Sequence, residues 1–249
     1  MTAPGRADRV AEPADTPPRP KKKKPRKPHQ AADLATPGGR KRARRELVWG
    51  DHGFLRARFR NLHRVSGEMW RSNQPSPRQI GEHARDRGIR TIVNLRGESS
   101  KGYYLLEREA CRAHGIDLID FRVFSRDTPT VEAILGAREL FERIEYPALM
   151  HCKSGADRAG LMAALYKLTR QQAPIEEAMA QLSLKYLHVR QGKPGMLDAF
   201  LEAYRDFTRH TPKAFLDWVC EDYDRQAVKS HFMERFESRI ALDRLLRRE

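Results

Sequence analysis

The sequence predicts an α/β fold in which helices flank a mostly parallel central sheet. Short apolar runs typical of buried strands alternate with amphipathic helical patterns between residues 70 and 170. The last apolar run, residues 147–150, leads directly into a loop that holds a cysteine, a glycine and an arginine. A helical pattern at residues 161–166 follows this loop. A loop at the carboxyl end of a strand is where open α/β sheets bind their ligands.

The elements are expected in a regular order. Strands are expected at residues 70–72, 91–95, 116–123 and 147–150. Helices before the cysteine loop are expected at residues 77–87, 103–114 and 129–144. In the third of these helices, Thr128 fits the N-cap, Pro129 the first position and Glu132 the first turn. Apolar stripes at helical spacing predict further helices around residues 174–182, 197–204, 215–219 and 232–240.

The first 45 residues carry a large share of the positive charge. The chain has 249 residues and a formal net charge of +15, and residues 1–45 hold 14 of its 48 Lys and Arg but only 4 of its 33 Asp and Glu. This segment is rich in Pro and Ala, so it cannot offset its ordering entropy by burying apolar surface. We expect a disordered basic tail at residues 1–45, a globular domain at 46–210 and a C-terminal helical extension at 211–249.

Composition also limits which binding partners and which cellular location can be expected. Clustered Lys and Arg attract phosphate groups, so the tail either contacts an anionic membrane surface or another polyanion, or is a solvated extension without a partner. No aromatic residue interleaves the basic run, which argues against a nucleic-acid function. No apolar stretch has transmembrane length or follows the N-terminal charges as in a signal peptide. We expect a cytoplasmic protein with peripheral membrane contact as an option, and the sequence leaves the oligomeric state open.

The three cysteines do not form a disulfide framework. A reducing compartment suits a chain with a working thiolate at Cys152. Cys111 and Cys220 are each either a buried, inert thiol or a partner for a protective disulfide with Cys152 after oxidation.

Residues 151–160 read His-Cys-Lys-Ser-Gly-Ala-Asp-Arg-Ala-Gly and have the layout of an anion-binding loop. Backbone N–H groups of such a loop converge on an oxyanion, and the N-terminus of the next helix adds positive potential. Cys152 is the candidate nucleophile, and Arg158 is suited to hold two phosphate oxygens with its planar guanidinium. Gly155 permits a turn with positive φ, and His151 is expected to point away from the pocket and support the loop. The residues expected to surround the phosphate are Lys153, Ser154, Gly155, Ala156, Asp157 and Arg158.

Attack of Cys152 on a phosphate ester would release an alkoxide or a phenoxide. A carboxylic acid must reach this loop to protonate that leaving group. Asp127 is the preferred candidate because it lies 25 residues before Cys152, on the loop that precedes a predicted helix. Asp157, next to Arg158, is either the alternative acid or one partner of an internal salt bridge. Asp120 is the third candidate, since a carboxylate at a strand end is more often structural.

The motif His-Cys-x-x-Gly-x-x-Arg with a trailing Gly resembles the signature of the cysteine-dependent protein tyrosine phosphatase superfamily. The chain looks most like its small dual-specificity-type members, in the bacterial and the plant-and-fungal atypical branch. Segments 69–75, 88–96 and 127–129 also resemble these phosphatases, and the resemblance covers residues 65–190. It implies the protein tyrosine phosphatase-like α/β fold, a phosphatase domain within residues 46–210, a general acid on the Asp127 loop, and neither a metal nor an organic cofactor.

The resemblance implies hydrolysis of phosphomonoesters through a phosphocysteine intermediate, with phosphotyrosine or mixed phosphoprotein substrates. The pattern Cys-x-x-Gly-x-Asp-Arg also resembles that of myotubularin-like lipid phosphatases, so an inositol phosphate or a phosphoinositide is the alternative substrate. The chain departs from the family at Ala159, where a Ser or Thr normally helps the sulfur to leave in the second step. This departure keeps open a third reading, a phosphate-binding scaffold that does not turn over.

Overall fold

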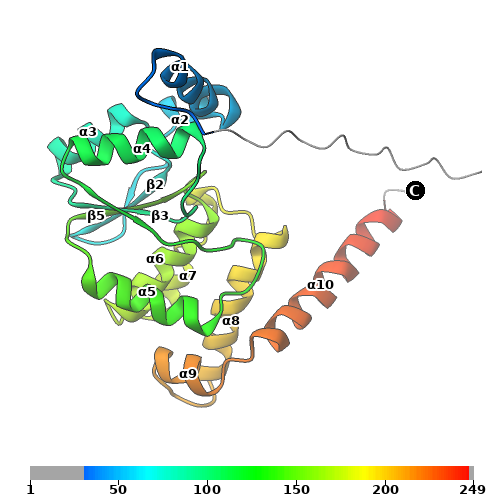
Figure 1. Cartoon of the computed structure of the whole chain (residues 1–249). Helices are drawn as coiled ribbons and strands as arrows, with labels where there is room; N and C mark the ends of the chain where they lie inside the picture. Colours follow the sequence, from blue (N-terminus) through cyan, green and yellow to red (C-terminus); the bar gives the residue numbers. More distant parts are fainter. Residues whose placement is uncertain (1–30, 247–249) are drawn as a thin grey trace, which may run out of the picture. The chain divides into compact units, whose positions relative to one another are not determined.

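A five-stranded sheet forms the centre of the fold (Figure 1). The structure is a computed structural model that describes the backbone of residues 31–246 and the side chains of residues 31–238. The strands are β1 (His63–Arg64), β2 (Met69–Asn73), β3 (Thr91–Asn94), β4 (Asp117–Asp120) and β5 (Ala148–Cys152). Their order in the sheet is β1-β2-β5-β3-β4, and only the β1–β2 pair is antiparallel within these residues. The predicted α/β fold with a mostly parallel sheet is therefore confirmed.

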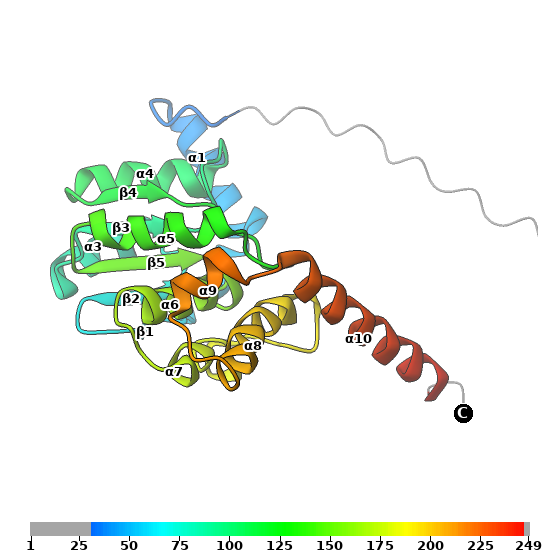
Figure 2. The same ribbon diagram turned by 90° about the horizontal axis from the view of Figure 1, so that it is seen from below.

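Helices cover both faces of this sheet (Figure 2). On one face, α3 (Pro77–Arg87) and α4 (Gly102–Ala113) bury a cluster that includes Ile80, Ile92 and Leu149. The other face carries the larger core, to which β5 contributes Met150 and Cys152. The helices on that face are α5 (Val131–Arg143), α6 (Asp157–Thr169), α7 (Ile175–Met179), α8 (Met196–Thr208) and α9 (Phe215–Glu221).

Shorter elements and the last helix complete the fold. The remaining elements are α1 (Pro37–Arg45), the π-helix η1 (Glu46–Gly50), α2 (Gly53–Arg58), the 3-10 turns η2 (Leu184–Tyr186) and η3 (Lys193–Gly195), and α10 (Arg225–Leu246). Helix α9 packs on the main core, in which its residues Phe215, Trp218 and Val219 are buried. Helix α10 then leads away from the sheet (Figure 2). The predicted C-terminal extension thus contains one helix that is part of the core and one that leaves it.

The sequence predicted most boundaries closely. Helix α3 begins at Pro77 and ends at Arg87 as expected, because Ser76 and Gln79 form a capping box and Gly88 takes the left-handed conformation with φ 61°. Strand β4 is shorter than the expected 116–123 segment and covers only Asp117–Asp120. No helix within residues 31–246 is long and apolar enough to cross a bilayer.

The disorder predicted for the end of the basic tail is wrong. Residues Pro37–Arg45 form α1, whose N-cap Thr36 accepts a hydrogen bond from the N–H of Gly39. Helix α1 lies directly on α4, since a side chain at Gly102 would come within 2.4 Å of the Cα of Ala43. Arg40 adds an ion pair with Glu109 at 2.6 Å. Residues 1–30 of the predicted tail lie outside the described residues.

The helix after the Asp127 loop also begins later than predicted. Its N-cap is Thr130, whose hydroxyl accepts the N–H of Ala133 at 3.2 Å, so the first helical residue is Val131 and not Pro129. Thr128 is buried instead, and its N–H donates to the carboxylate of Asp127 at 3.0 Å. Both threonines suit an N-cap, and the contacts of the folded chain select the second.

Candidate active site

The cysteine loop joins β5 to α6 at the carboxyl end of the sheet. Cys152 is the last residue of β5 and is paired in register with Asn73 of β2. Its side chain is only 2% exposed. Helix α6 starts at Asp157, five residues later, and its 13 residues aim the positive end of the helix dipole at the loop. The predicted strand, loop and helix are all present.

The carbonyl groups of the loop are held from behind. Arg71 is fully buried, and its Nη2 donates to the carbonyl oxygens of Gly155 and Ala156, each at 2.9 Å. Asn61 donates from Nδ2 to the carbonyl oxygen of Ser154 at 2.9 Å. In a planar trans peptide, the N–H points opposite to the C=O. The N–H groups of the residues that follow these carbonyls are therefore directed to the other side of the loop.

That other side is the side of Cys152, the candidate nucleophile. The N–H of Gly155 donates to the sulfur of Cys152 at 3.2 Å. Gly155 has φ 76°, and a side chain at this position would lie 2.6 Å from the backbone nitrogen of Asn73. Only glycine combines this φ with such a close approach. The loop thus forms a cup of amides around the sulfur, which can accept the oxygens of a tetrahedral anion.

The guanidinium of Arg71 is surrounded by hydrogen-bond acceptors and one aromatic ring. Besides the loop carbonyls, it donates to the carbonyl oxygen of Gln181 at 2.7 Å and lies over the ring of Tyr186 at 4.1 Å. Burial lowers the pKa of Arg71 to about 10. The guanidinium therefore stays charged at neutral pH and adds its field to the loop.

Arg158 lies in the first turn of α6 and is not tightly bound. Its closest polar contact among those described is the carbonyl oxygen of Leu95, at 3.5 Å from Nη1. It lines a pocket of about 720 Å³ together with Asp127 and three other arginines. The complete lining is Arg122, Val123, Phe124, Ser125, Arg126, Asp127, Thr128, Pro129, Thr130, Ala133, Arg158, Leu161, Leu165 and Arg225.

His151 supports the loop from the opposite face of the sheet. Its Nε2 lies 2.6 Å from Oε1 of Glu107, and both side chains are fully buried. The other oxygen of Glu107 accepts from Gln74 at 2.7 Å. The contact directs the imidazole toward α4, as expected for a residue that supports the loop.

A buried carboxylate anchors the segment before β1 to the site. Asp51 lies 2.8 Å from a guanidinium nitrogen of Arg96 and 2.8 Å from one of Arg56. Lys153 of the loop lies 3.7 Å from the same carboxylate. Burial opposes the charged form of Asp51, but hydrogen bonding to Arg96 and the surrounding positive charges lower its pKa. Lys153, which the sequence predicts at the phosphate, thus lies near a buried carboxylate, and its phosphate-binding role stays a prediction.

Asp127, the preferred general acid, lines the same pocket as Arg158 but is held by α10. Its carboxylate lies 2.7 Å from Nη2 of Arg225 and 3.1 Å from Nζ of Lys229. Partial burial opposes the charged form, yet the contact with Lys229 and the charge of Arg225 lower the pKa of Asp127. The side chain is therefore an ionised carboxylate in this conformation.

Asp157, the alternative acid, belongs to a buried network. Its Oδ1 lies 2.8 Å from Nδ1 of His188, and Nε2 of the same imidazole lies 2.7 Å from Asp198. Burial opposes charge on His188, but the hydrogen bonds to the two carboxylates raise its pKa to about 9. The contacts match the internal salt bridge that the sequence left open for Asp157.

Asp120, the third candidate, accepts hydrogen bonds from Asn94 at 2.7 Å and from Tyr104 at 2.5 Å at the end of β4. These contacts fit a structural carboxylate.

Cys111 is buried in the cluster beneath α3 and α4, whereas Cys152 belongs to the core on the other face of the sheet. Burial raises the pKa of the Cys111 thiol. Cys111 therefore fits the inert thiol, and Cys220 is exposed on α9.

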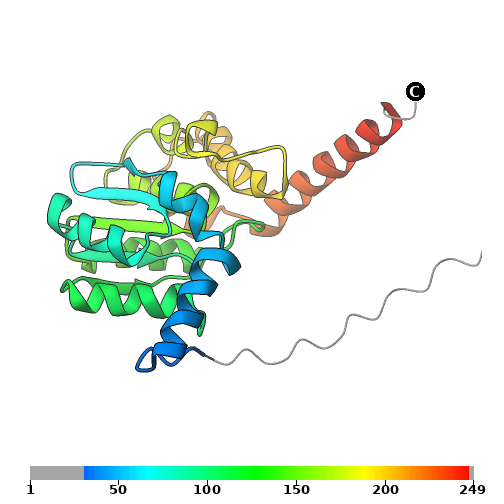
Figure 3. The ribbon, with the colours of Figure 1, turned by 90° about the horizontal axis from the view of Figure 1, so that it is seen from above.

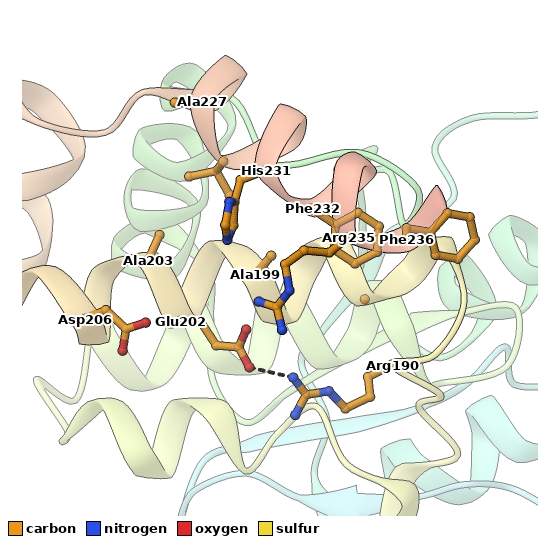
Figure 4. A pocket seen from close by; sticks show the side chains of 12 residues that line it. Arg190, Ala199, Glu202, Ala203, Asp206, Ala227, His231, Phe232, Arg235 and Phe236 are labelled. Carbon is orange, nitrogen blue, oxygen red and sulfur yellow. Dashed lines mark hydrogen bonds and ion pairs between the residues drawn. The ribbon is translucent and has the colours of Figure 1, made fainter. Parts of the chain in front are cut away.

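A second pocket, of about 430 Å³, lies between α8 and α10 and contains no residue of the cysteine loop. Figure 4 shows His231 and Arg235 reaching from α10 toward α8, where Arg190 and Glu202 form an ion pair at 2.6 Å. This pocket offers no nucleophile, so the chemistry is assigned to the loop.

Sequence reasoning did not assign a role to several supporting residues. Arg71 lies in segment 69–75, which resembles the opening segment of these phosphatase domains. An arginine on a strand predicted to be buried was the signal that could have indicated a supporting role. Asn61, Asp51 and His188 carry no comparable signal, because each meets its partner only through the tertiary fold.

Comparison of the sequence with known proteins finds a matching family and similar proteins. A family model described as "DSP-PTPase phosphatase fused to NAD+ Kinase" matches residues 61–194. Dual specificity protein phosphatase TpbA, from two strains of Pseudomonas aeruginosa, is 31% identical over 121 residues, which are 47% of this chain and 52% of the relative. The chain spans about half the length of the curated relatives it matches.

Several solved structures are also similar to this chain. P. aeruginosa TpbA has 22% sequence identity and a TM-score of 0.47, and the match covers 58% of this chain and 84% of that one. The core catalytic domain of the PP-IP phosphatase SIW14 from S. cerevisiae has 18% identity and a TM-score of 0.47, with 62% and 96% covered.

We expect Arg71→Lys to lower kcat/KM for an aryl phosphate about 10²-fold, since an ammonium cannot hold both loop carbonyls and a displaced catalytic group costs about this much. The inhibition constant of orthovanadate should rise in parallel. Arg64→Lys is the matched control, because Arg64 also bonds main-chain oxygens, at Ser66 and Gly67, but away from the loop. Equal vanadate inhibition in the two variants would contradict the role of Arg71.

His188 should make stability depend on pH in a defined window. Its pKa is raised by folding, so its stabilisation is complete below about pH 6.5 and is lost as pH rises toward about 9. We expect the free energy of unfolding in urea to fall by up to about 3 kcal/mol across this window. His188→Gln should flatten the dependence and His210→Gln should not. An unchanged slope in His188→Gln would refute the assignment.

Proposed function

We propose a function from one premise, which is that the chain belongs to the family of DSP-PTPase phosphatases whose model is described as fused to NAD+ kinase. The matched residues, 61–194, contain the whole cysteine loop. We propose that the protein hydrolyses phosphomonoesters through a phosphocysteine intermediate. The observation that carries this proposal is the amide cup around the sulfur of Cys152, which is followed by Arg158 in the first turn of α6.

In the first step, the sulfur of Cys152 attacks phosphorus, the S–P bond forms and the bond from phosphorus to the leaving oxygen breaks. The loop N–H groups and Arg158 hold the three other oxygens and offset the charge of the transition state. Asp127 acts here in its protonated form, which becomes more populated as pH falls, and gives its proton to the leaving oxygen. Arg71 and Asn61 act as positioning residues, because they turn the loop carbonyls away from the phosphate.

In the second step, water attacks phosphorus, the S–P bond breaks and the thiolate is restored. Asp127 takes the proton from this water, and its ionised state beside Arg225 and Lys229 is already the form that a base requires. Ala159 is fully buried and brings no hydroxyl to the departing sulfur. We propose that this step limits turnover.

The substrate class follows from the relatives and from the pocket. The matched curated relatives are named dual specificity protein phosphatases, so we propose phosphotyrosine and mixed phosphoprotein substrates. The alternative, an inositol phosphate or a phosphoinositide, is favoured by one observation: four arginines and a single carboxylate line the pocket beside the loop. A reducing compartment such as the cytoplasm is part of this proposal, because the thiolate must stay unoxidised.

Phosphate release from a panel of phosphotyrosine peptides, phosphoserine peptides, inositol phosphates and phosphoinositides tests the proposal. We expect release from phosphotyrosine peptides that is lost in Cys152→Ser, because the alkoxide of serine is not available at neutral pH. Cys111→Ser is the matched control and should keep the activity. Binding of phosphopeptide without release at any pH would leave only the non-catalytic scaffold.

For the acid, we expect Asp127→Asn to lower kcat/KM about 10²–10⁴-fold on substrates with poor leaving groups and much less on an activated aryl phosphate. Since Arg225 and Lys229 hold the pKa of Asp127 low, kcat/KM on poor leaving groups should rise as pH falls. The double variant Arg225→Gln, Lys229→Gln should move this limb to higher pH. If Asp157→Asn shows the leaving-group pattern and Asp127→Asn does not, the acid is misassigned.

A further inference from the structure

The most exposed large apolar side chains of the described residues gather on three segments. They are 45–73% exposed and comprise Trp49, Phe54, Leu55, Phe59, Phe124, Leu184, Leu187 and Val189. We call residues 49–60, 122–126 and 184–190 the apolar rim. A protein that buries its apolar residues elsewhere rarely leaves so many together without a partner.

Each segment of the apolar rim borders the cysteine loop. Asn61, directly after the first segment, donates to the carbonyl oxygens of Ser154 and Tyr186, so it ties the first and third segments to the loop. His188 of the third segment contacts Asp157 of the loop. The second segment lines the pocket with Arg158. The rim therefore lies beside the loop that holds Cys152.

The views agree with this placement. In Figure 2, the arrowheads of the parallel strands point toward the side where the blue N-terminal helices lie. In Figure 3, residues 184–190, coloured yellow, lie at that same end of the sheet. The carboxyl ends of parallel strands and the apolar rim thus share one end of the fold.

The charges on the rim have a single sign. Its exposed charged residues are Arg58, Arg122, Arg126, Lys185 and Arg190. The one acidic residue in the three segments, Asp51, is buried and paired with Arg56 and Arg96. A protein partner would offer mixed charges, but exposed Trp, Phe and Leu interleaved with Arg and Lys are what an anionic bilayer surface binds.

We infer that the apolar rim docks on an anionic lipid bilayer and places the cysteine loop against the membrane surface. Trp49 and Phe54, whose rings lie 5.4 Å apart, enter the boundary between headgroups and acyl chains. The basic residues of the rim contact the headgroup phosphates. If the proposed phosphatase function holds, its substrates are phosphate groups presented at such a surface. The docking itself does not depend on catalysis.

The first test measures binding of the full chain carrying Cys152→Ser to phosphatidylcholine vesicles with and without one quarter phosphatidylglycerol. We expect binding only with the anionic lipid, and Arg58→Gln, Lys185→Gln should lower the partition coefficient about 25-fold, because each basic residue contributes about fivefold. The matched control is Arg112→Gln, Arg143→Gln, two exposed arginines at the ends of α4 and α5, and it should change the coefficient less than twofold. An equal loss in both pairs would show binding by net charge alone and would overturn the inference.

The second test reads the position of the rim directly. Trp218 is buried and Trp70 packs against the cluster beneath α3 and α4, whereas Trp49 is 66% exposed. Brominated acyl chains should therefore quench the fluorescence of the bound protein through Trp49. Trp49→Phe should abolish this quenching while binding continues. Quenching that persists in Trp49→Phe, or its absence in the bound wild type, would refute insertion of the rim. Absence of vesicle binding would also refute it and would leave the rim to a protein partner.

The phosphatase activity and the membrane docking can fail independently, and different results would identify each failure. Vesicle binding without phosphate release from any substrate would remove the phosphatase and keep the docking surface. Release from a small aryl phosphate at equal rates in wild type and in the Arg58→Gln, Lys185→Gln variant, without vesicle binding, would keep the phosphatase and remove the docking surface.

Discussion

A single buried guanidinium determines which way the cysteine loop faces. Arg71 reaches from β2 beneath the loop and holds the carbonyl oxygens of Gly155 and Ala156 at 2.9 Å. Because each of these peptides is planar and trans, fixing the carbonyl also fixes the following N–H on the opposite side. Asn61 applies the same constraint to the carbonyl of Ser154, and the N–H that follows it, that of Gly155, donates to the sulfur of Cys152. A buried charge without partners is costly, so these carbonyls and Arg71 require one another.

The chemistry of the site then depends on groups that lie outside the loop. The carboxylate of Asp127 meets Arg225 and Lys229, which belong to α10, beyond the residues that the family model matches. Tyr223 donates to the carbonyl oxygen of Pro129 at 2.8 Å, and Arg225 donates to that of Thr128 at 3.0 Å. The C-terminal segment is therefore fastened to the loop that carries the proposed acid, and the protonation of Asp127 is linked to the position of α10.

The sequence predicted what local pattern controls. Gly155 was expected to take a positive φ, and it does so because no side chain fits against β2. Helix α3 was predicted to the residue, since its capping box and Gly88 are local signals. Helix α1 was missed because the basic composition of residues 1–45 conceals the small residues, among them Ala43, that let it approach α4.

The parts of the site that could not be predicted depend on contacts between distant residues. Arg71 meets Gly155 across 84 positions of the sequence, and Asn61 meets Ser154 across 93. Neither residue type nor spacing reveals such pairs in one sequence. The sequence favoured Asp127 over Asp157 without excluding either, because the network in which His188 contacts Asp157 forms only in the tertiary fold.

The central claim is that phosphate passes through the sulfur of Cys152, and chemical trapping tests it most directly. The protein is mixed with a phosphotyrosine substrate labelled on phosphorus, quenched in acid within one turnover and digested. The account predicts label on the peptide that contains Cys152, at higher occupancy than in enzymes where the second step is fast, because Ala159 offers no hydroxyl. Release of phosphate with no labelled peptide, or undiminished release by Cys152→Ser, would contradict it.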